Sequence, residues 1–508
     1  GVGPSIENGF YYDFLFENPI KENELEIIEK EMKRIAKSSQ KFIRSEITKK
    51  DAVKIFKNQN LKLELIESAE SDEGVGDEVV STYTNDEFVD LCMGPHIPNT
   101  NVLKYFKLTK ISGAYWRGDD SNVQLQRIYG TSWFTKEDLN QYLIQQEEAE
   151  KRDHRKLGNE LDLFASSEEL GSGNFLWKPK GAVLRDVIES YSKKAHLQNG
   201  YSLVNTPHIG KSILWETSGH LDHYSENMYP PIHHVENNET YYLKPMNCPF
   251  HILVYKSDLH SYKELPLRYF EFGSVYRYEK TGVLHGLLRL RGFTQDDAHI
   301  FCTIEQINDE VKTLLSFSVN LLGSFGLTEI EADLSTKPKK YIGSDKDWDN
   351  ATSSLKQSLT ELEVPFQTAE GEGAFYGPKI DLHAKDAIGR RWQLSTIQID
   401  FAQPENFDIE YVNSNNKKSR PVMIHRALLG SVERFTAVLL EHYAGNLPGW
   451  LSPTQVDILT IGDVNDYAEN ILNDLNSFRV NLDNRNIRLG EKLHNSEKSK
   501  TPIQIIIG

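Results

Sequence analysis

The chain has 508 residues, of which 39% are hydrophobic and 26% charged, and this composition predicts a soluble globular protein of about three domains. No apolar run is long enough to cross a bilayer and no signal peptide opens the chain, so no membrane partner is expected. The net charge of −17 argues against DNA as a partner, although RNA binding needs only a local basic surface.

The three cysteines argue against a disulfide framework, because they are odd in number and none has an obvious partner nearby in the sequence. They favour a reducing compartment, and we predict a cytoplasmic location. Local basic segments occur at residues 33–50 and 151–156. Such runs are more often solvated faces than binding sites.

Residues 1–135 mix strand-like segments with one amphipathic helix and predict an α+β domain. The helix is expected at Lys21–Ser38, where four apolar residues recur at helical spacing: Leu25, Ile28, Met32 and Ile35. Both ends of the chain are expected to be cut, because it opens on GVGPSIENGFYYDF without an initiating Met and stops at IQIIIG. The chain is therefore interpreted as a fragment.

Residues 136–164 predict one long charged helix that connects two domains. The segment is rich in Glu, Gln, Lys and Arg and has few apolar anchors. Strands and helices then alternate irregularly over residues 165–448, and these strands are typical of an antiparallel sheet.

The most informative segment of this region is Arg289–Phe301, RLRGFTQDDAHIF. In an extended strand, side chains alternate between two faces. One face would then carry six polar or aromatic residues: Arg289, Arg291, Phe293, Gln295, Asp297 and His299. The other face is mostly apolar or small. A polar face of this kind is as often solvated as functional. The flanking sequence must therefore decide whether this face is a binding site.

An aromatic strand precedes this segment and ends at Arg277 and Glu279, which share strand parity. We expect the two strands to form an antiparallel hairpin whose face includes Arg289 and Phe293. Guanidinium groups bind phosphate, a ring stacks on a purine, and a carboxylate accepts from an exocyclic amine, so this face predicts a nucleotide site. No P-loop is present, and EGEGAFYG lacks the spacing of a dinucleotide fingerprint.

The last segment, from about residue 449, predicts the start of an α/β domain. PGWLSPTQVDILTIG gives a proline-bounded turn followed by a buried strand, and a helix is expected around Asp466–Phe478.

Three stretches resemble the threonyl-tRNA synthetases, a family of class II aminoacyl-tRNA synthetases. They are YRYEKTGVLHGLLRLRGFTQDDAHIF, KPMNCPFH and VMIHRALLGSVERF. The resemblance runs almost end to end. It implies an α+β multidomain protein: an editing-type domain at residues 1–135 without its N-terminal part, a linker helix at 136–164, a class II catalytic domain with an antiparallel sheet flanked by helices at 165–448, and a partial anticodon-binding domain at 449–508.

The resemblance implies one Zn²⁺ per subunit, held by Cys248, His299 and His425, whereas their spacing alone carries no metal signature. Zinc would recognise the amino and hydroxyl groups of threonine and so reject valine. An apolar pocket separates such near-isosteres by only about 1–3 kcal/mol. The remaining threonine-binding residues implied are Met246, Gln295, Asp297, Tyr376 and Gln398.

For ATP, the resemblance implies a set of five residues: Arg277, Glu279, Arg289, Phe293 and Arg434. Arg277 and Arg434 would act catalytically on the phosphates, and Gly430 would leave room for the nucleotide. Mg²⁺ is expected to accompany ATP. His220 is a candidate base for transfer to the tRNA, and Pro207, in the position of class II motif 1, implies a homodimer.

The editing-type domain implies hydrolysis of seryl-tRNA by the full-length protein, and VDLCMGPH places Asp90, Cys92 and His96 at its matching positions. The family's site also uses an HxxxH pair that would precede Gly1, so we predict that this chain lacks part of the editing site.

The predicted function is therefore ligation of threonine to tRNA(Thr), with threonine, ATP and tRNA(Thr) as partners. Two alternatives are kept. The first is a class II ligase for serine or proline, against which the zinc trio argues. The second is a non-catalytic paralogue that binds tRNA-like RNA. Such a paralogue would be expected to have lost Arg277, Arg434 or a zinc ligand.

Overall fold

The computed structural model describes residues 3–6, 8–68, 79–119, 121–234, 239–342, 344–374 and 376–508. The chain divides into two compact units, Gly1–Glu147 and Glu148–Gly508. Among the described residues, no helix combines the length and the apolarity that crossing a bilayer would require.

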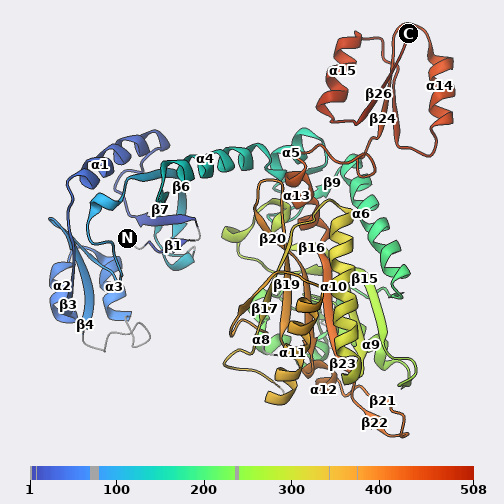
Figure 1. Cartoon of the computed structure of the whole chain (residues 1–508), viewed down its shortest axis with the longest axis horizontal. Helices are drawn as coiled ribbons and strands as arrows, with labels where there is room; N and C mark the ends of the chain where they lie inside the picture. The colour runs from blue at the N-terminus through green and yellow to red at the C-terminus, as the bar shows by residue number, and fades with distance from the viewer. Residues whose placement is uncertain are drawn as a thin grey trace. The chain divides into compact units, whose positions relative to one another are not determined.

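The first unit contains two antiparallel sheets and their helices (Figure 1). One sheet has the order β1-β2-β7-β6, and its strands are Ser5–Ile6, Gly9–Phe14, Gln124–Trp133 and Tyr105–Tyr115. The other has the order β3-β4-β5, and its strands are Phe42–Thr48, Val79–Asn85 and Phe88–Leu91. The helices are α1 (Leu25–Lys37), α2 (Lys49–Ile55) and α3 (Asn60–Ser68).

The amphipathic helix predicted at Lys21–Ser38 is confirmed as α1, preceded by a single 3-10 turn at Glu22–Glu24. Its apolar stripe packs on the β1-β2-β7-β6 sheet, where Leu25, Leu108 and Ile128 are buried together. The unit is thus of α+β class, as its sequence predicts.

The single helix predicted over residues 136–164 is wrong: two helices occupy the segment, α4 (Lys136–Lys151) and α5 (His154–Glu160). The break occurs because the Asp153 side chain accepts from the backbone N–H of Arg155 and so caps α5. Leu157 and Leu161 are buried, so α5 packs into the second unit and does not act as a free connector.

An eight-stranded sheet forms the centre of the second unit, in the order β10-β15-β16-β23-β20-β19-β17-β18. These strands are Ser202–Leu203, Leu267–Tyr276, Gly292–Cys302, Val422–Ser431, Arg391–Asp400, Lys379–Lys385, Ile330–Ser335 and Phe366–Ala369. Every interior pair is antiparallel, as predicted, but both outermost pairs, β10–β15 and β17–β18, are parallel.

Helices cover this sheet and enclose the main core (Figure 1). They are α6 (Pro179–Gln198), α10 (Ile307–Ser324), α11 (Asp345–Glu361) and α13 (Val432–His442). Leu315 on α10 and Ile300 on β16 are both fully buried in that core. Burying each such side chain contributes about 1.5–3 kcal/mol, so the sheet is a rigid platform for the residues on its opposite face.

Short elements complete the second unit. The helices are α7 (Ser212–Thr217), α8 (His220–His223), α9 (Cys248–Lys256) and α12 (Ala402–Asn406). The strands are β8 (Phe164–Ala165), β9 (Leu176–Trp177), β11 (Ile209–Lys211), β12 (Ile232–His234), β13 (Glu239–Leu243), β14 (His260–Ser261), β21 (Tyr411–Val412) and β22 (Lys418–Ser419). A 3-10 turn, η7 (Gly286–Leu288), lies in the loop between β15 and β16.

The C-terminal part is a parallel sheet in the order β25-β24-β26, with strands Val480–Asp483, Val456–Thr460 and Ile503–Ile507. Its helices are α14 (Asn465–Asp474) and α15 (Leu489–Lys498) (Figure 1). The predicted α/β pattern is confirmed, although the helix expected at Asp466–Phe478 ends at Asp474.

Candidate functional site

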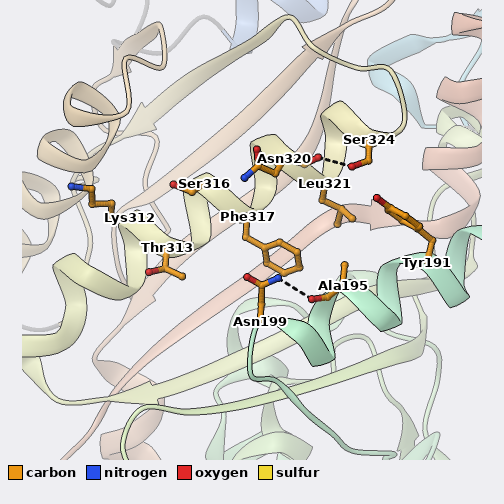
Figure 2. Close-up of a pocket in the computed structure, with 10 residues that line it drawn as sticks. All are labelled: Tyr191, Ala195, Asn199, Lys312, Thr313, Ser316, Phe317, Asn320, Leu321 and Ser324. Carbon is orange, nitrogen blue, oxygen red and sulfur yellow. Dashed lines mark hydrogen bonds between the residues drawn. The ribbon is translucent and has the colours of Figure 1, made fainter.

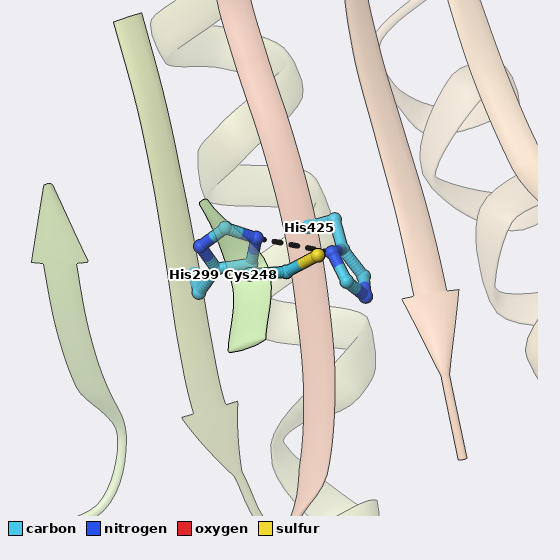
Figure 3. Close-up of side chains that lie close together, drawn as sticks. All are labelled: Cys248, His299 and His425. Carbon is cyan, nitrogen blue, oxygen red and sulfur yellow. Dashed lines mark hydrogen bonds between the residues drawn. The ribbon is translucent and has the colours of Figure 1, made fainter. Parts of the chain in front are cut away.

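Cys248, His299 and His425 meet beside the central sheet (Figure 3). Their ligand atoms all lie within 4.8 Å of one another, and His299 Nε2 is 3.0 Å from His425 Nδ1. Cys248 is the first residue of α9, whereas the two histidines lie on β16 and β23. Cys248 and His299 are buried and His425 is partly exposed. The structure thus brings together three residues that lie far apart in the sequence.

The two histidines face each other because of the sheet register. Gln398 on β20, His425 on β23 and His299 on β16 are Cα partners in one row across three adjacent strands. Side chains in one row of an antiparallel sheet point to the same face. The row therefore places both imidazoles and an amide side by side over the site.

A shell of buried polar groups orients the two imidazoles. His299 Nδ1 lies 2.8 Å from His251 Nδ1, and His251 Nε2 lies 3.2 Å from Glu271 Oε1. His425 Nε2 lies 2.7 Å from Asp400 Oδ2. This leaves His299 Nε2 and His425 Nδ1 directed at the centre of the trio. Ring partners of this kind fix the orientation of metal-binding histidines.

Burial sets the protonation of His299 and Cys248. It holds the pKa of the His299 imidazole well below its usual value, reinforced by the charges of His251 and His425, so the ring is neutral. Burial, together with the charges of Asp297 and Asp400, raises the pKa of the Cys248 thiol well above its usual value. A metal ion would find one ready nitrogen ligand in His299, while the thiol would have to lose its proton on binding.

The donor set fits a zinc ion. One thiolate and two imidazoles make a mixed S/N set of three ligands, which leaves a fourth tetrahedral position open. Asp297 Oδ1 lies 3.8 Å from His299 Nε2, so a carboxylate borders that space.

The residues predicted to contact an amino acid border the same space. Gln398 accepts a hydrogen bond of 3.0 Å from the Tyr376 hydroxyl, whose ring centroid is 5.7 Å from that of His425. Asp297 accepts from Asn247 Nδ2 at 2.9 Å. Gln295 is partly buried two residues before Asp297 on β16, opposite Gly273 of β15.

The other face of β16, expected to be mostly apolar or small, carries one fully buried carboxylate, Asp296. Gln295 pairs with Ser431 and Asp297 with Ala427, so β23 holds extra residues between them in a bulge. Asp296 accepts from the backbone N–H groups of Leu428 and Leu429 in that bulge, at 3.1 and 3.0 Å. The carboxylate thus satisfies N–H groups that the bulge removes from the ladder.

Two guanidinium groups lie at the edge of the site without carboxylate partners among the described residues. Arg277 donates to Pro245 O at 3.2 Å, and its Cζ is 5.1 Å from the centroid of the Phe293 ring. Arg434, on the first turn of α13, donates to Gln393 O at 3.1 Å and to Leu288 O at 3.3 Å. Cations held by carbonyl groups alone are free to neutralise phosphate.

The predicted strand begins later than expected, at Gly292, because the chain first forms the turn η7. Arg289 therefore precedes β16; its side chain is 56% exposed and pairs with Glu279 at 2.9 Å. Gly430 lies in β23, and its φ of +80° is one that glycine favours. A Cβ there would lie 2.9 Å from Leu394 O, so the backbone itself requires this glycine.

His220 is buried and begins the short helix α8. Its Nδ1 lies 2.7 Å from Ser218 Oγ and its Nε2 lies 3.3 Å from Met246 Sδ. Burial lowers the pKa of His220 to about 4, with added effects from His425 and Arg277. The imidazole is thus neutral at physiological pH and can accept a proton.

In the first unit, Cys92 and His96 lie together, with Sγ 3.1 Å from Nε2. Burial lowers the pKa of His96, which also stacks on Phe42 at a centroid distance of 5.2 Å. Asp90 is already held by Lys62 and by the Tyr12 hydroxyl. The structure therefore groups Cys92 with His96 but gives Asp90 two local partners.

A hollow of about 520 Å³ lies between α6 and α10 and contains none of the predicted site residues (Figure 2). Its only charged lining residue, Lys312, already pairs with Glu361 at 2.7 Å. The candidate site is therefore the face of the sheet around the trio.

Sequence reasoning missed the groups behind the ligands: His251, Glu271, Asn247 and Asp400. Asp400 and Gln398 share strand parity in STIQIDF, which was the one available signal for Asp400. His251 lies three residues after Cys248, on the next turn of α9, and only the helix brings it to His299.

Three family models match the chain in succession. Residues 80–129 match the threonyl and alanyl tRNA synthetase second additional domain, and residues 232–443 match the tRNA synthetase class II core domain (G, H, P, S and T). Residues 455–508 match the anticodon binding domain.

Curated relatives are similar over the whole chain. The threonine–tRNA ligases of Sulfurihydrogenibium sp. (strain YO3AOP1) and Aquifex aeolicus (strain VF5) are each 50% identical over 514 residues. These alignments cover 100% of this chain and 79% and 80% of the relatives. A crystal structure of the RNA binding domain of threonyl-tRNA synthetase from Cryptosporidium parvum Iowa II is 40% identical, with a TM-score of 0.67, over 70% of this chain and 89% of that chain. The chain belongs to the threonyl-tRNA synthetase family of class II aminoacyl-tRNA synthetases.

Proposed function

We propose that this chain ligates threonine to tRNA(Thr) through a threonyl-adenylate intermediate, with a zinc ion that recognises threonine. The observation that carries the proposal is the position of the Cys248–His299–His425 trio beside a polar sheet face, near enough to Arg277 for its charge to act on the Cys248 thiol. Aminoacylation of tRNA is the activity of the family. The zinc ion, the threonyl-adenylate intermediate and the roles of single residues go beyond this family activity and are our proposal.

Cys248, His299 and His425 would hold the ion. When bound, Zn²⁺ would supply a Lewis acid that could take both the amino and the hydroxyl group of threonine, since catalytic zinc sites can expand from four to five ligands. Asp297, whose pKa burial raises, borders this position and would accept protons from those groups. Tyr376 and Gln398, already hydrogen-bonded to each other, would fix the side of the pocket, with Met246 and Gln295 as further walls.

In this proposal, valine is rejected because it has no hydroxyl group, which leaves polar groups of the pocket without a partner. Leaving such groups unpaired gives far stronger discrimination than an apolar pocket, which separates near-isosteres by about 1–3 kcal/mol. Serine has the hydroxyl and is only smaller, so it is expected to enter.

For the first step, an oxygen of the threonine carboxylate attacks the α-phosphorus of ATP, and the bond from that phosphorus to pyrophosphate breaks. Arg277 would neutralise the α-phosphate and Arg434 the γ-phosphate, with Arg289 assisting. Phe293 would stack on the adenine, and Glu279 would accept from its amino group. Members of this family use ATP with Mg²⁺.

For the second step, the terminal ribose hydroxyl of the tRNA takes the threonyl group and AMP leaves. His220 is the proposed base, because Ser218 holds its Nδ1 while its Nε2 faces Met246, a proposed threonine contact. Its pKa of about 4 keeps it neutral but makes it a weak base, so a modest contribution is expected.

Two further proposals concern other parts of the protein. The Cys92–His96 pair supports hydrolysis of seryl-tRNA in the full-length protein, with Asp90 beside it.

A homodimer is proposed through the segment of Pro207, where Leu203 and Ile209 are each 44% exposed. The cytoplasmic location stays a prediction.

Exchange of pyrophosphate into ATP tests the main proposal, because it reports the first step without tRNA. Exchange should occur with threonine, more weakly with serine and not with valine, and a zinc chelator should abolish it. Cys248→Ser should lose zinc and exchange together, whereas Cys302→Ser, which removes a buried cysteine outside the site, should keep both. No exchange from folded, zinc-loaded protein would favour the RNA-binding paralogue, against which the retained Arg277, Arg434 and trio argue.

A further inference from the structure

The segment between α4 and α5 carries a buried histidine that the proposed mechanism does not use. His154 is fully buried, and its Nδ1 lies 2.6 Å from Glu441 Oε1. Its Nε2 accepts a hydrogen bond of 3.0 Å from the backbone N–H of Leu287. Because Nε2 accepts, Nδ1 carries the proton and donates to Glu441. The imidazole thus bridges Glu441 and Leu287, and each of its two ring nitrogens makes one hydrogen bond.

Both partners of His154 belong to elements that hold Arg434. Glu441 lies near the end of α13, the helix that carries Arg434 on its first turn. Leu287 lies in η7, and the next residue, Leu288, offers the carbonyl group to which Arg434 donates at 3.3 Å. One imidazole therefore connects the helix that carries Arg434 with the turn that orients its guanidinium.

Two arginines also fix this bridge. Arg152 donates to the last carbonyl groups of α13, Glu441 O at 3.3 Å and His442 O at 2.9 Å. Glu441 Oε2 also pairs with Arg390 at 2.7 Å. Asp153, His154 and Glu441 come close enough to hold a metal, but the carboxylate of Glu441 and both ring nitrogens already have protein partners.

Gly286 shows independently how close the approach is. Its φ is +50°, and a Cβ there would lie 2.1 Å from His154 Nε2. Real Cβ atoms do not come this near another heavy atom, so only glycine allows η7 to reach the imidazole. The turn is therefore built around His154.

We propose that His154 is a positioning residue for ATP: it holds η7 and α13 in register so that Arg434 meets the γ-phosphate. The inference rests on the proposed ATP site. It also makes the beginning of α5, where the chain enters the second unit, part of the support of that site.

Equilibrium binding of ATP with Mg²⁺ to the whole chain tests the proposal, followed by KM values in pyrophosphate exchange. His154→Leu removes donor and acceptor at similar volume and should weaken ATP binding about tenfold, the scale of one lost hydrogen-bonding bridge. The KM for threonine and the zinc content should not change. His154→Gln keeps one donor and one acceptor and should restore most of the affinity.

A matched control separates positioning from the loss of any buried imidazole. His196 is also fully buried and its Nδ1 lies 2.7 Å from Ser192 O on its own helix α6, so His196→Leu should leave ATP affinity unchanged. If His154→Leu does not fold, Arg152→Met, which keeps the stem and removes the donors, should weaken ATP binding in the same direction.

The outcomes distinguish the two proposals. If folded His154→Leu and Arg152→Met bind ATP as tightly as the wild type, the inference about His154 is overturned and the proposed function still stands. Wild-type protein that binds ATP but gives no exchange with threonine would overturn the proposed function, while the ATP affinities of the variants would still decide the role of His154. Absence of ATP binding by folded wild-type protein would overturn both.

Discussion

Asp296 and Asp297 are adjacent on β16, yet their environments differ because alternate side chains of a strand face opposite sides of the sheet. Asp297 faces the trio. Asp296 faces the core, where it accepts from backbone N–H groups and lies 3.9 Å from Arg426. Burial nevertheless dominates and raises the pKa of Asp296 to about 7.

This pKa predicts how stability depends on pH. Between 3.8 and about 7, the folded chain keeps a proton on Asp296 that the unfolded chain has released. The contribution of this residue to the free energy of unfolding is thus present below pH 3.8 and is lost as pH rises towards 7. Relative to Asp296→Asn, the Tm of the wild type should fall across this interval, as calorimetry at several pH values can measure. Parallel Tm curves would contradict the assignment.

His251 gives a second prediction at the residue scale. Its ring nitrogen contacts the nitrogen of His299 that faces away from the trio. Removing such a partner typically lowers metal affinity 10–100-fold, so His251→Leu should weaken zinc binding on the order of this range, as measured by competition with a chromophoric chelator. His260→Leu is the matched control, since His260 is also buried but pairs with Glu264 at 3.0 Å. Equal zinc affinity in both variants would refute the supporting role.

At the scale of the elements, the segment VMIHRALLGSVERF forms the strand β23 and the start of the helix α13, which carries Arg434. The bulge in β23 was not predicted, because its cause lies on another strand: Asp296 stabilises it from β16. Local pattern thus predicts the element, but not the irregularity that a distant side chain imposes.

The bulge predicts the effect of Gly430→Ala. A Cβ at this position meets Leu394 O, and its left-handed backbone costs an L-residue about 1–2 kcal/mol. The variant should therefore lower the Tm with or without ATP. An unchanged Tm together with a raised KM for ATP would instead support the expectation that this glycine makes room for the nucleotide.

At the scale of the whole molecule, the fold class and the order of its parts follow from the sequence through motif resemblance, and the family models agree with that order. The parallel outermost pairs and the break between α4 and α5 do not follow. The parallel pairs depend on which strands meet in the folded sheet, and the break combines a local cap, Asp153, with the burial of Leu157 and His154 in the second unit.

The same dependence explains what could be predicted of the site. Cys248, His299 and His425 are 51 and 126 residues apart, and only resemblance could group them. Their mutual placement comes from the row that β20, β23 and β16 share. His251 and Asp400 were not predicted because they act through contacts with those ligands, and the sequence does not show such contacts.

The division into units predicts the behaviour of fragments. A fragment of residues 148–508 contains the second unit with Arg152 and His154, so it should bind ATP as the whole chain does. A fragment that starts at residue 165 lacks α5 and its buried Leu157, together with Leu161 of the main core, and should have a lower Tm and weaker ATP binding. Equal Tm values for the two fragments, measured by calorimetry, would show that α5 is dispensable.

The opposed carboxylates of β16 have a consequence for fidelity. Asp296 ties the strand to β23 from behind at the level where Asp297 faces the pocket. A strand anchored in this way cannot move in to contact a smaller amino acid. The pocket therefore excludes side chains larger than that of threonine but not smaller ones. In the proposed function, the frequency with which serine is activated in place of threonine would then follow the ratio of their concentrations. Accuracy would depend on a second site that removes serine.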